Sequence, residues 1–162
     1  MRYKVAPEPA DADRLFAVQD ALALVPGRVE DCCARIRDRT DVPTRERARD
    51  WLTFLTALGL ARETDRGFHR VREDPDREDL AEAYMANVYL ARELQDALAT
   101  AGPLPAADAF EAVRGSVPRW ERHHHADWER EWRETAGRLL EWGAVFGILE
   151  RAEDDRYRVA DG

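Results

Sequence analysis

The chain has 162 residues, a net charge of −8 and 44% hydrophobic residues. This length fits one or two small domains, and the apolar content excludes a disordered chain. Because the sequence contains neither a signal-peptide core nor an apolar run near the roughly 20 residues of a membrane span, we expect a soluble cytoplasmic protein without membrane contact.

Three helices and a hairpin are predicted in the first half of the chain. Helices at about 11–24 and 28–39 are ended by the segments VPG and TDVP, because proline and glycine interrupt helices. A third helix over 44–58 carries its apolar residues on one stripe: Ala48, Trp51, Leu52, Leu55 and Leu58. The strands 60–64 and 68–71 follow, joined by the turn segment DRG.

The second half predicts the same order of elements. A long helix covers about 77–100, the segment AADAFEAVRG forms a second helix, and a third helix spans about 127–146. The segment ILERAEDDRYRV (148–159) then forms a second hairpin. We expect the long helix to connect the two halves or to serve dimerisation.

Two stretches of sequence occur twice. QDALA is found at 19–23 and 95–99, and LGLARETDRGFHRV (58–71) aligns without gaps with FGILERAEDDRYRV (146–159). The two offsets are 76 and 88 residues, so the second copy contains 12 additional residues. The sequence therefore predicts a duplicated domain with an insert at about 115–127 in the second copy.

The end of each copy resembles the recognition helix and wing of winged-helix proteins. The first copy matches the family pattern at Leu52, Leu55, Gly59, Leu60, Arg62, Gly67, Phe68 and Val71. The second copy matches it more loosely, at Leu139, Gly147, Ile148, Arg151, Tyr157 and Val159. The resemblance implies a mostly α-helical protein with small β-hairpin wings, arranged as two tandem winged-helix domains at 11–74 and 77–162.

The charged residues of the chain resemble those of proteins from halophilic archaea. Lys4 is the only lysine, and 33 acidic residues exceed 25 basic ones. In a salt-rich cell such acidity mainly serves solubility, so it does not exclude a nucleic-acid partner. The segment 28–72 holds 11 basic and 8 acidic residues, whereas 77–162 holds 11 and 18. A DNA site is therefore expected in the first copy.

The resemblance implies that the third helix of the first copy enters the major groove of double-stranded DNA and that the wing contacts its backbone. Arginine and threonine side chains form one line opposite the apolar stripe of this helix, and further arginines follow in the wing. The predicted DNA-binding residues are Arg45, Arg49, Thr53, Thr56, Arg62, Arg66 and Arg70.

The second copy has lost this line of side chains. At the offset of 88, Arg49 becomes Gly137, Thr53 becomes Glu141 and Thr56 becomes Ala144. We expect the second copy to serve packing, dimerisation or partner binding rather than DNA contact through its third helix.

Two functions fit this pattern. One is a transcription regulator that binds DNA through domain 1. The other is a winged-helix module for protein–protein interaction or dimerisation without DNA binding, which is favoured by four acidic residues among the arginines: Glu46, Asp50, Glu63 and Asp65.

The insert contains three consecutive histidines whose role the sequence leaves open. His123 with Asp127, and His125 with Glu129, have the spacing of two ligands on one helix face, but no third ligand follows. A solvated or pH-responsive surface is the alternative to a metal site. We expect no metal site here, and we expect Trp120 to be the tryptophan that is exposed to a partner.

Catalytic motifs are missing from the sequence. Cys32 and Cys33 are adjacent and lack metal-ligand spacing, and there is neither a phosphate-binding glycine loop nor a GxSxG motif. We therefore expect no enzymatic activity and no cofactor.

Overall fold

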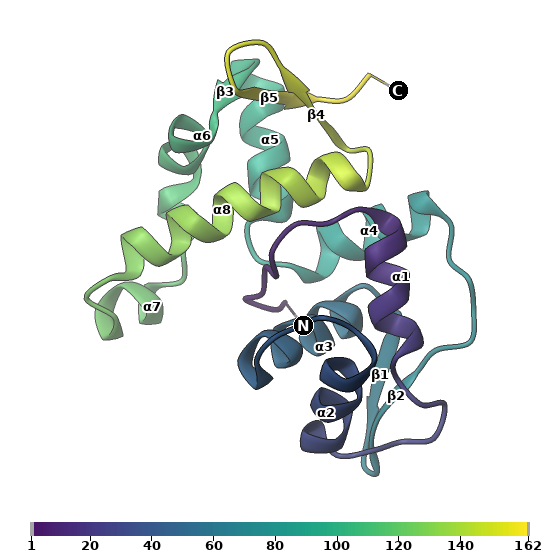
Figure 1. Cartoon of the computed structure of the whole chain (residues 1–162). Helices are drawn as coiled ribbons and strands as arrows, with labels where there is room; N and C mark the ends of the chain where they lie inside the picture. The colour runs from purple at the N-terminus through teal and green to yellow at the C-terminus, as the bar shows by residue number, and fades with distance from the viewer. Residues whose placement is uncertain (1, 162) are drawn as a thin grey trace. The chain divides into compact units, whose positions relative to one another are not determined.

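The computed structural model describes residues 2–161 and separates into two compact units, Met1–Val88 and Tyr89–Gly162 (Figure 1). Helices dominate both units, and each unit carries a small antiparallel sheet, as the sequence predicts. Within the described residues, no helix combines the length and the apolar character that a bilayer crossing requires.

The first unit contains three helices, a hairpin and a fourth helix. In chain order these are α1 (Ala12–Asp20), α2 (Val29–Arg39), α3 (Arg45–Ala57), β1 (Ala61–Thr64), β2 (Gly67–Arg70) and α4 (Arg77–Asn87). Side chains cap three of the helices: Asp11 accepts from the Arg14 amide, Thr44 from the Arg47 amide, and Asp76 from the Asp79 amide. These caps explain why the helices begin where they do.

The core of the first unit lies between its first three helices and the hairpin. Leu15 of α1, Ile36 of α2 and Leu55 of α3 are fully buried. Gln19 is buried as well, and its Nε2 donates to the carbonyl oxygens of Leu60 and Val71 at 3.1 and 3.3 Å. Residues 60 and 71 flank the hairpin, so the Gln19 side chain connects α1 to the base of the wing by hydrogen bonds.

A close backbone contact fixes the wing of the first unit against the loop between α1 and α2. Gly27 and Phe68 exchange two backbone hydrogen bonds of 2.9 and 2.8 Å. Gly67 has a φ of +119°, and a Cβ on it would lie 2.1 Å from the Gly27 carbonyl oxygen. Only glycine fits at this position, which explains the glycine of the family pattern.

The second unit repeats this plan with an addition. It contains α5 (Ala91–Ala101), β3 (Leu104–Pro105), α6 (Ala106–Val113), the 3₁₀ turn η1 (Arg114–Ser116), α7 (Arg119–His124), α8 (Trp128–Val145), β4 (Leu149–Ala152) and β5 (Arg156–Val159). Its strands form one sheet in the order β3-β5-β4. Trp132, Trp142 and Phe110 are fully buried at its centre. As in the first unit, the segment after the first helix pairs with the second wing strand.

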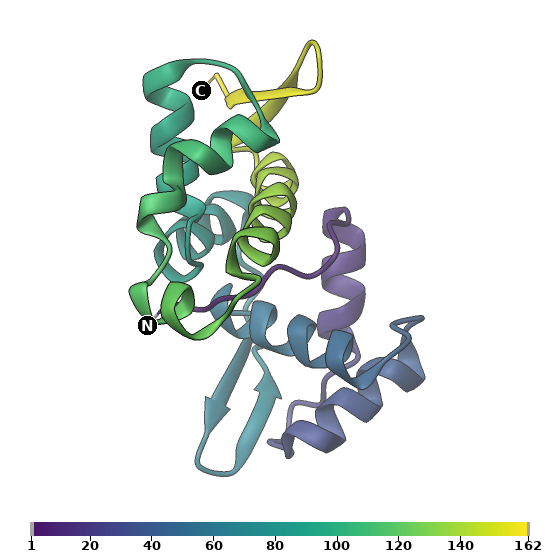
Figure 2. The same ribbon diagram turned by 90° about the vertical axis from the view of Figure 1, so that its left-hand side faces the viewer.

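The duplication seen in the sequence corresponds to equivalent elements. The helices α1, α2 and α3 correspond to α5, α6 and α8, and each third helix is followed by a glycine of positive φ, +79° at Gly59 and +77° at Gly147. The extra elements η1 and α7 fall at the predicted insert. In Figures 1 and 2, α7 lies beside the N-terminal end of α8.

The prediction of one helix over 77–100 is wrong. Helix α4 ends at Asn87, Val88 is extended, and Leu90 has a φ of +71° before α5 begins. The break is fixed by contacts within the first unit: the Tyr3 amide donates to the Asn87 carbonyl, and Asn87 Nδ2 donates to the Ala57 carbonyl. The separation into units accordingly places α4 with the first unit, whereas the sequence prediction assigned residues 77–100 to the second domain.

Candidate nucleic-acid interface

The exposed edge of α3 carries the predicted line of side chains. Arg45 and Arg49 are exposed, whereas Thr53 and Thr56 are half-buried. The Thr56 hydroxyl donates to the Leu52 carbonyl at 2.8 Å, so it is already used within the helix. The part of this edge that is open to a ligand is therefore its N-terminal half, where the two arginines lie.

Arg45 and Arg49 of α3 differ in their surroundings. Arg45 Nη2 lies 3.1 Å from Glu30 Oε1 of α2. A backbone hydrogen bond and this guanidinium lower the pKa of the Glu30 carboxyl. Arg49 has no ion pair within the described residues. Because both members of the Arg45 pair are solvent-exposed, exchanging Glu30 for a phosphate costs little.

The wing offers two of its three predicted arginines. Arg62 and Arg66 are exposed, and no ion pair holds either side chain in the described chain. Arg70 instead pairs with Asp20 of α1 at 3.2 Å, and its amide donates to the Ala23 carbonyl. Arg62 lies opposite His69 in the hairpin, so it projects from the other face than Arg70. Arg62 and Arg70 nevertheless border one hollow beside the wing, where the Asp20 carboxylate already pairs with Arg70.

In the second unit the wing occupies the C-terminal half of the equivalent helix face. Glu141 of α8 accepts hydrogen bonds from Arg151 Nη2 of β4 and from the Tyr157 hydroxyl of β5. Burial alone would raise the pKa of Glu141, but these two donors outweigh it and lower that pKa. Burial and the bond to Glu141 raise the pKa of Tyr157 to about 12. These contacts, which we call the Glu141 latch, hold the wing against α8.

The Glu141 latch was missed by the sequence interpretation, although a signal for it exists. At the offset of 88, Thr53, Glu63 and His69 are replaced by Glu141, Arg151 and Tyr157. The three exchanges together create an acceptor and its two donors. In the first unit these positions hold Thr53, Glu63 and His69, which form no hydrogen bonds to one another in the described structure, so the wing does not cover the edge of α3.

One contact of the recognition helix is common to both units. Arg133 of α8 lies 3.3 Å from Glu111 of α6, as Arg45 of α3 lies 3.1 Å from Glu30 of α2. Arg45 and Arg133 are also equivalent at the offset of 88. These two arginines therefore form a matched pair for mutagenesis.

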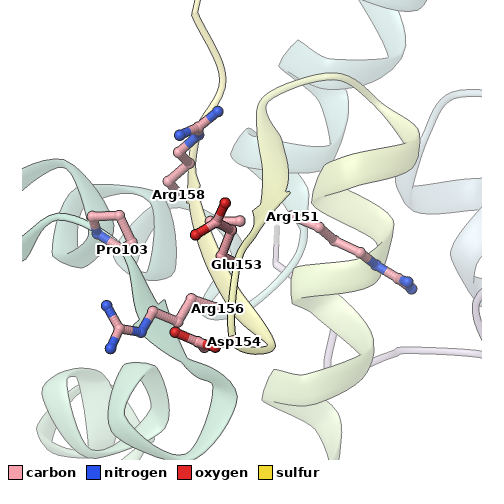
Figure 3. Close-up of a pocket in the computed structure, with 7 residues that line it drawn as sticks. Pro103, Arg151, Glu153, Asp154, Arg156 and Arg158 are labelled. Atoms are coloured by element: carbon pink, nitrogen blue, oxygen red, sulfur yellow. The ribbon is translucent and has the colours of Figure 1, made fainter.

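The wing of the second unit borders an open hollow of about 560 Å³ (Figure 3). Arg156 and Arg158 flank Glu153 and Asp154 there, and Arg151 points away from them. The Nε of Arg158 lies 2.5 Å from a carboxylate oxygen of Glu150. Since acidic and basic groups alternate around this hollow, it presents no surface of one charge.

A family model described as the halobacterial double winged helix domain matches residues 1–161. The chain belongs to this family. The match confirms the predicted tandem winged-helix fold and the resemblance to proteins of halophilic archaea. No curated protein and no solved structure matched the sequence. The double winged helix domain is thus a fold of the DNA-binding type, in which α3 and α8 hold the positions of recognition helices.

The histidines and cysteines of the double winged helix domain lie in different surroundings. No group of three His, Cys, Asp or Glu side chains within residues 2–161 is arranged to hold a metal ion. His123, His124 and His125 are exposed. Cys32 and Cys33 are buried, and burial raises the pKa of both thiols, which lowers their reactivity.

Proposed function

We propose that this chain is a transcription regulator that binds double-stranded DNA through its first winged-helix domain. The observation that carries the proposal is the contrast between two equivalent helix faces. The edge of α3 presents Arg49 without an ion pair in the described structure, whereas α8 has Gly137 at that position and uses the half-buried Glu141, one turn further on, to hold its own wing. The protein then acts as a DNA-binding protein of the salt-rich cytoplasm and needs neither a cofactor nor catalysis.

In this function α3 lies in the major groove. Arg49 donates two hydrogen bonds to a guanine or pairs with a phosphate, and Thr53 contacts the neighbouring base or backbone. Arg45 exchanges Glu30 for a phosphate, and Arg62 and Arg66 of the wing hold the adjacent backbone. A dimer of this chain binds two DNA half-sites, one through each copy of α3.

The matched pair of arginines tests the proposal. Arg45→Glu and Arg133→Glu each remove one exposed ion pair and place two carboxylates side by side. Arg133→Glu also removes the contact of the guanidinium with the Phe110 ring at 5.5 Å, so the thermal stability of both variants is measured beside their DNA binding. We expect Arg45→Glu to weaken duplex binding by about tenfold and Arg49→Glu by about tenfold to a hundredfold, since one base contact contributes about 1–3 kcal/mol. Arg133→Glu should stay within about twofold of the unchanged protein, the range of a surface charge remote from the contacts.

Binding is measured by fluorescence anisotropy of a labelled duplex pool over a series of KCl concentrations, because phosphate-driven affinity falls steeply with salt. Equal losses at Arg45 and Arg133 would contradict the assignment to domain 1. Glu141→Arg is a poor companion variant, because it places a second positive charge against Arg151 and breaks the latch.

A second function is supported by the acidic residues beside the α3 edge. Glu46 is exposed, and Asp50 is exposed as well, so the basic strip is narrow. A protein–protein interaction or dimerisation module without DNA binding fits this mixed surface. This second function predicts that the protein self-associates in sedimentation velocity experiments and that it has no affinity for duplex DNA at any salt concentration.

A further inference from the structure

The insert of the second domain displays an aromatic and basic helix face. Trp120 of α7 is 52% exposed, and the neighbouring Arg119, Arg122, His123 and His124 are exposed too. Trp120 lies three and four residues before the two histidines, so these three rings share one side of the helix. We call these five residues the α7 face.

The α7 face carries no exposed negative charge. Glu121 is the only acidic residue in the segment 117–126, and it is 1% exposed. Arg119 and Arg122 form no ion pair within residues 2–161. By contrast, the chain from residue 77 onward has 18 acidic and 11 basic residues. A positive surface in so acidic a region requires an explanation beyond solubility.

The fold holds α7 rigidly enough to present this face. Val117 and Glu121 are buried and anchor the helix, at 2% and 1% exposure. The His125 amide donates to the Glu121 carbonyl and ends the helix, and α7 packs on the start of α8. Tryptophan and arginine are the residue types enriched at the energetic centres of binding interfaces, so their combination on one exposed helix favours a binding surface.

The position of α7 in the fold indicates which partner this is. It lies between α6 and α8, where the first domain has only the short turn from Thr40 to Thr44. In helix-turn-helix proteins this turn lies next to the DNA backbone, beside the N-terminus of the recognition helix. The insert therefore places arginines at the edge of the domain that faces DNA in this fold.

We propose that the α7 face is a second DNA contact, which binds the sugar–phosphate backbone of duplex DNA. Arg119 and Arg122 pair with phosphates, and the Trp120 ring packs against a deoxyribose. This contact gives the second domain a DNA site of its own, since α8 has Gly137 where α3 has Arg49. It rests on the proposed function, because it assumes that the chain is a DNA-binding protein.

The two kinds of contact respond differently to salt, which gives a specific test. Screening and counterion release weaken the arginine–phosphate pairs as KCl rises. The apolar contact of Trp120 is not screened. In the full-length protein we expect the double variant Arg119→Glu with Arg122→Glu to lose about tenfold or more in duplex affinity at low salt and less at high salt. Trp120→Ala should lose affinity by a similar factor at every salt concentration.

The control is Arg92→Glu, which reverses an exposed arginine of α5 in the same domain and should leave affinity unchanged. Tryptophan fluorescence gives a direct readout, because the other tryptophans are less exposed than Trp120. Saturating duplex should protect Trp120 from acrylamide quenching, and this protection should vanish in Trp120→Phe.

Each outcome decides between the two proposals. Binding that depends on Arg49 but not on the α7 face overturns this inference and leaves the proposed function standing. No duplex binding by the unchanged protein at any salt concentration overturns both. Competition by poly-glutamate as effective as competition by duplex, with the same dependence on Trp120, overturns the DNA assignment in favour of an acidic protein partner.

Discussion

Removing the Glu141 latch should loosen the second wing and destabilise the second domain. Glu141→Ala deletes the acceptor for both the Arg151 guanidinium and the Tyr157 hydroxyl. The Arg151 side chain is 69% exposed, so its ion pair adds only a small contribution. The bond from the half-buried Tyr157 to a charged acceptor contributes about 1.5 kcal/mol. The sum predicts a loss of about 2 kcal/mol in the free energy of unfolding.

The pH dependence of this loss follows from the two shifted pKa values. The pKa of Glu141 is lowered from 4.5, so its contribution is present above pH 4.5 and disappears as the pH falls through the lowered value. The pKa of Tyr157 is raised from 10.0 to about 12, so its contribution is complete below pH 10.0 and disappears as the pH rises toward 12. The stability difference between the unchanged protein and Glu141→Ala should therefore be largest between these limits.

Thermal unfolding followed by near-ultraviolet circular dichroism measures this effect, because Trp132 and Trp142 lie in the core of the second domain. A loss of 2 kcal/mol lowers the unfolding midpoint of so small a domain by about 8–16 °C. Glu134→Ala is the control, since it removes an exposed glutamate of the same helix that has no ion pair among the described residues. Equal midpoints for the two variants, or a difference that does not depend on pH, would refute the latch.

Two further results are expected in the first domain. Gly67→Ala should lower the free energy of unfolding by more than about 3 kcal/mol, because its Cβ would meet the Gly27 carbonyl oxygen at 2.1 Å with a φ of +119°. Gly59→Ala should lower it by only about 1 kcal/mol, because its Cβ meets no described atom within 4 Å. Urea unfolding compares the two variants, and equal losses would contradict the close contact at Gly67. Cys32 and Cys33 should react with a thiol reagent only in the unfolded chain, since both side chains are buried and burial raises the pKa of both thiols. Rapid labelling of the native protein would contradict this prediction.

Most of the fold could be predicted because its signals are local. The apolar stripe of α3, the glycine after it and the hairpin turn each occupy a few consecutive residues, and the duplication repeats them at a constant offset. The line of Arg45 and Arg49 could be predicted for the same reason: a helix places residues four apart on one side.

The features that escaped prediction depend on distant contacts. The break between α4 and α5 is invisible to periodicity, because Tyr84 and Leu94 are buried on both sides of it. It is fixed by Tyr3, which is far away in the sequence. The direction of Arg70 likewise depends on Asp20 of α1. Pattern reasoning assigns a residue to a face, but a partner from another element decides what its side chain does.

The charge on the first domain sets a limit on what it can bind alone. In the proposed complex, Arg45, Arg49, Arg62 and Arg66 neutralise at most four phosphates, which corresponds to a slope of log affinity against log salt of about −3.6. Such an affinity falls by more than about a thousandfold for each tenfold rise in salt, which leaves little binding in a salt-rich cell. With the two arginines of the α7 face, the slope of log affinity against log salt becomes steeper, about −5.4. Trp120 adds a contact that salt does not weaken. A regulator that works at high salt gains from the apolar contact in particular, which is a physical reason for an ordered helix that keeps a tryptophan exposed.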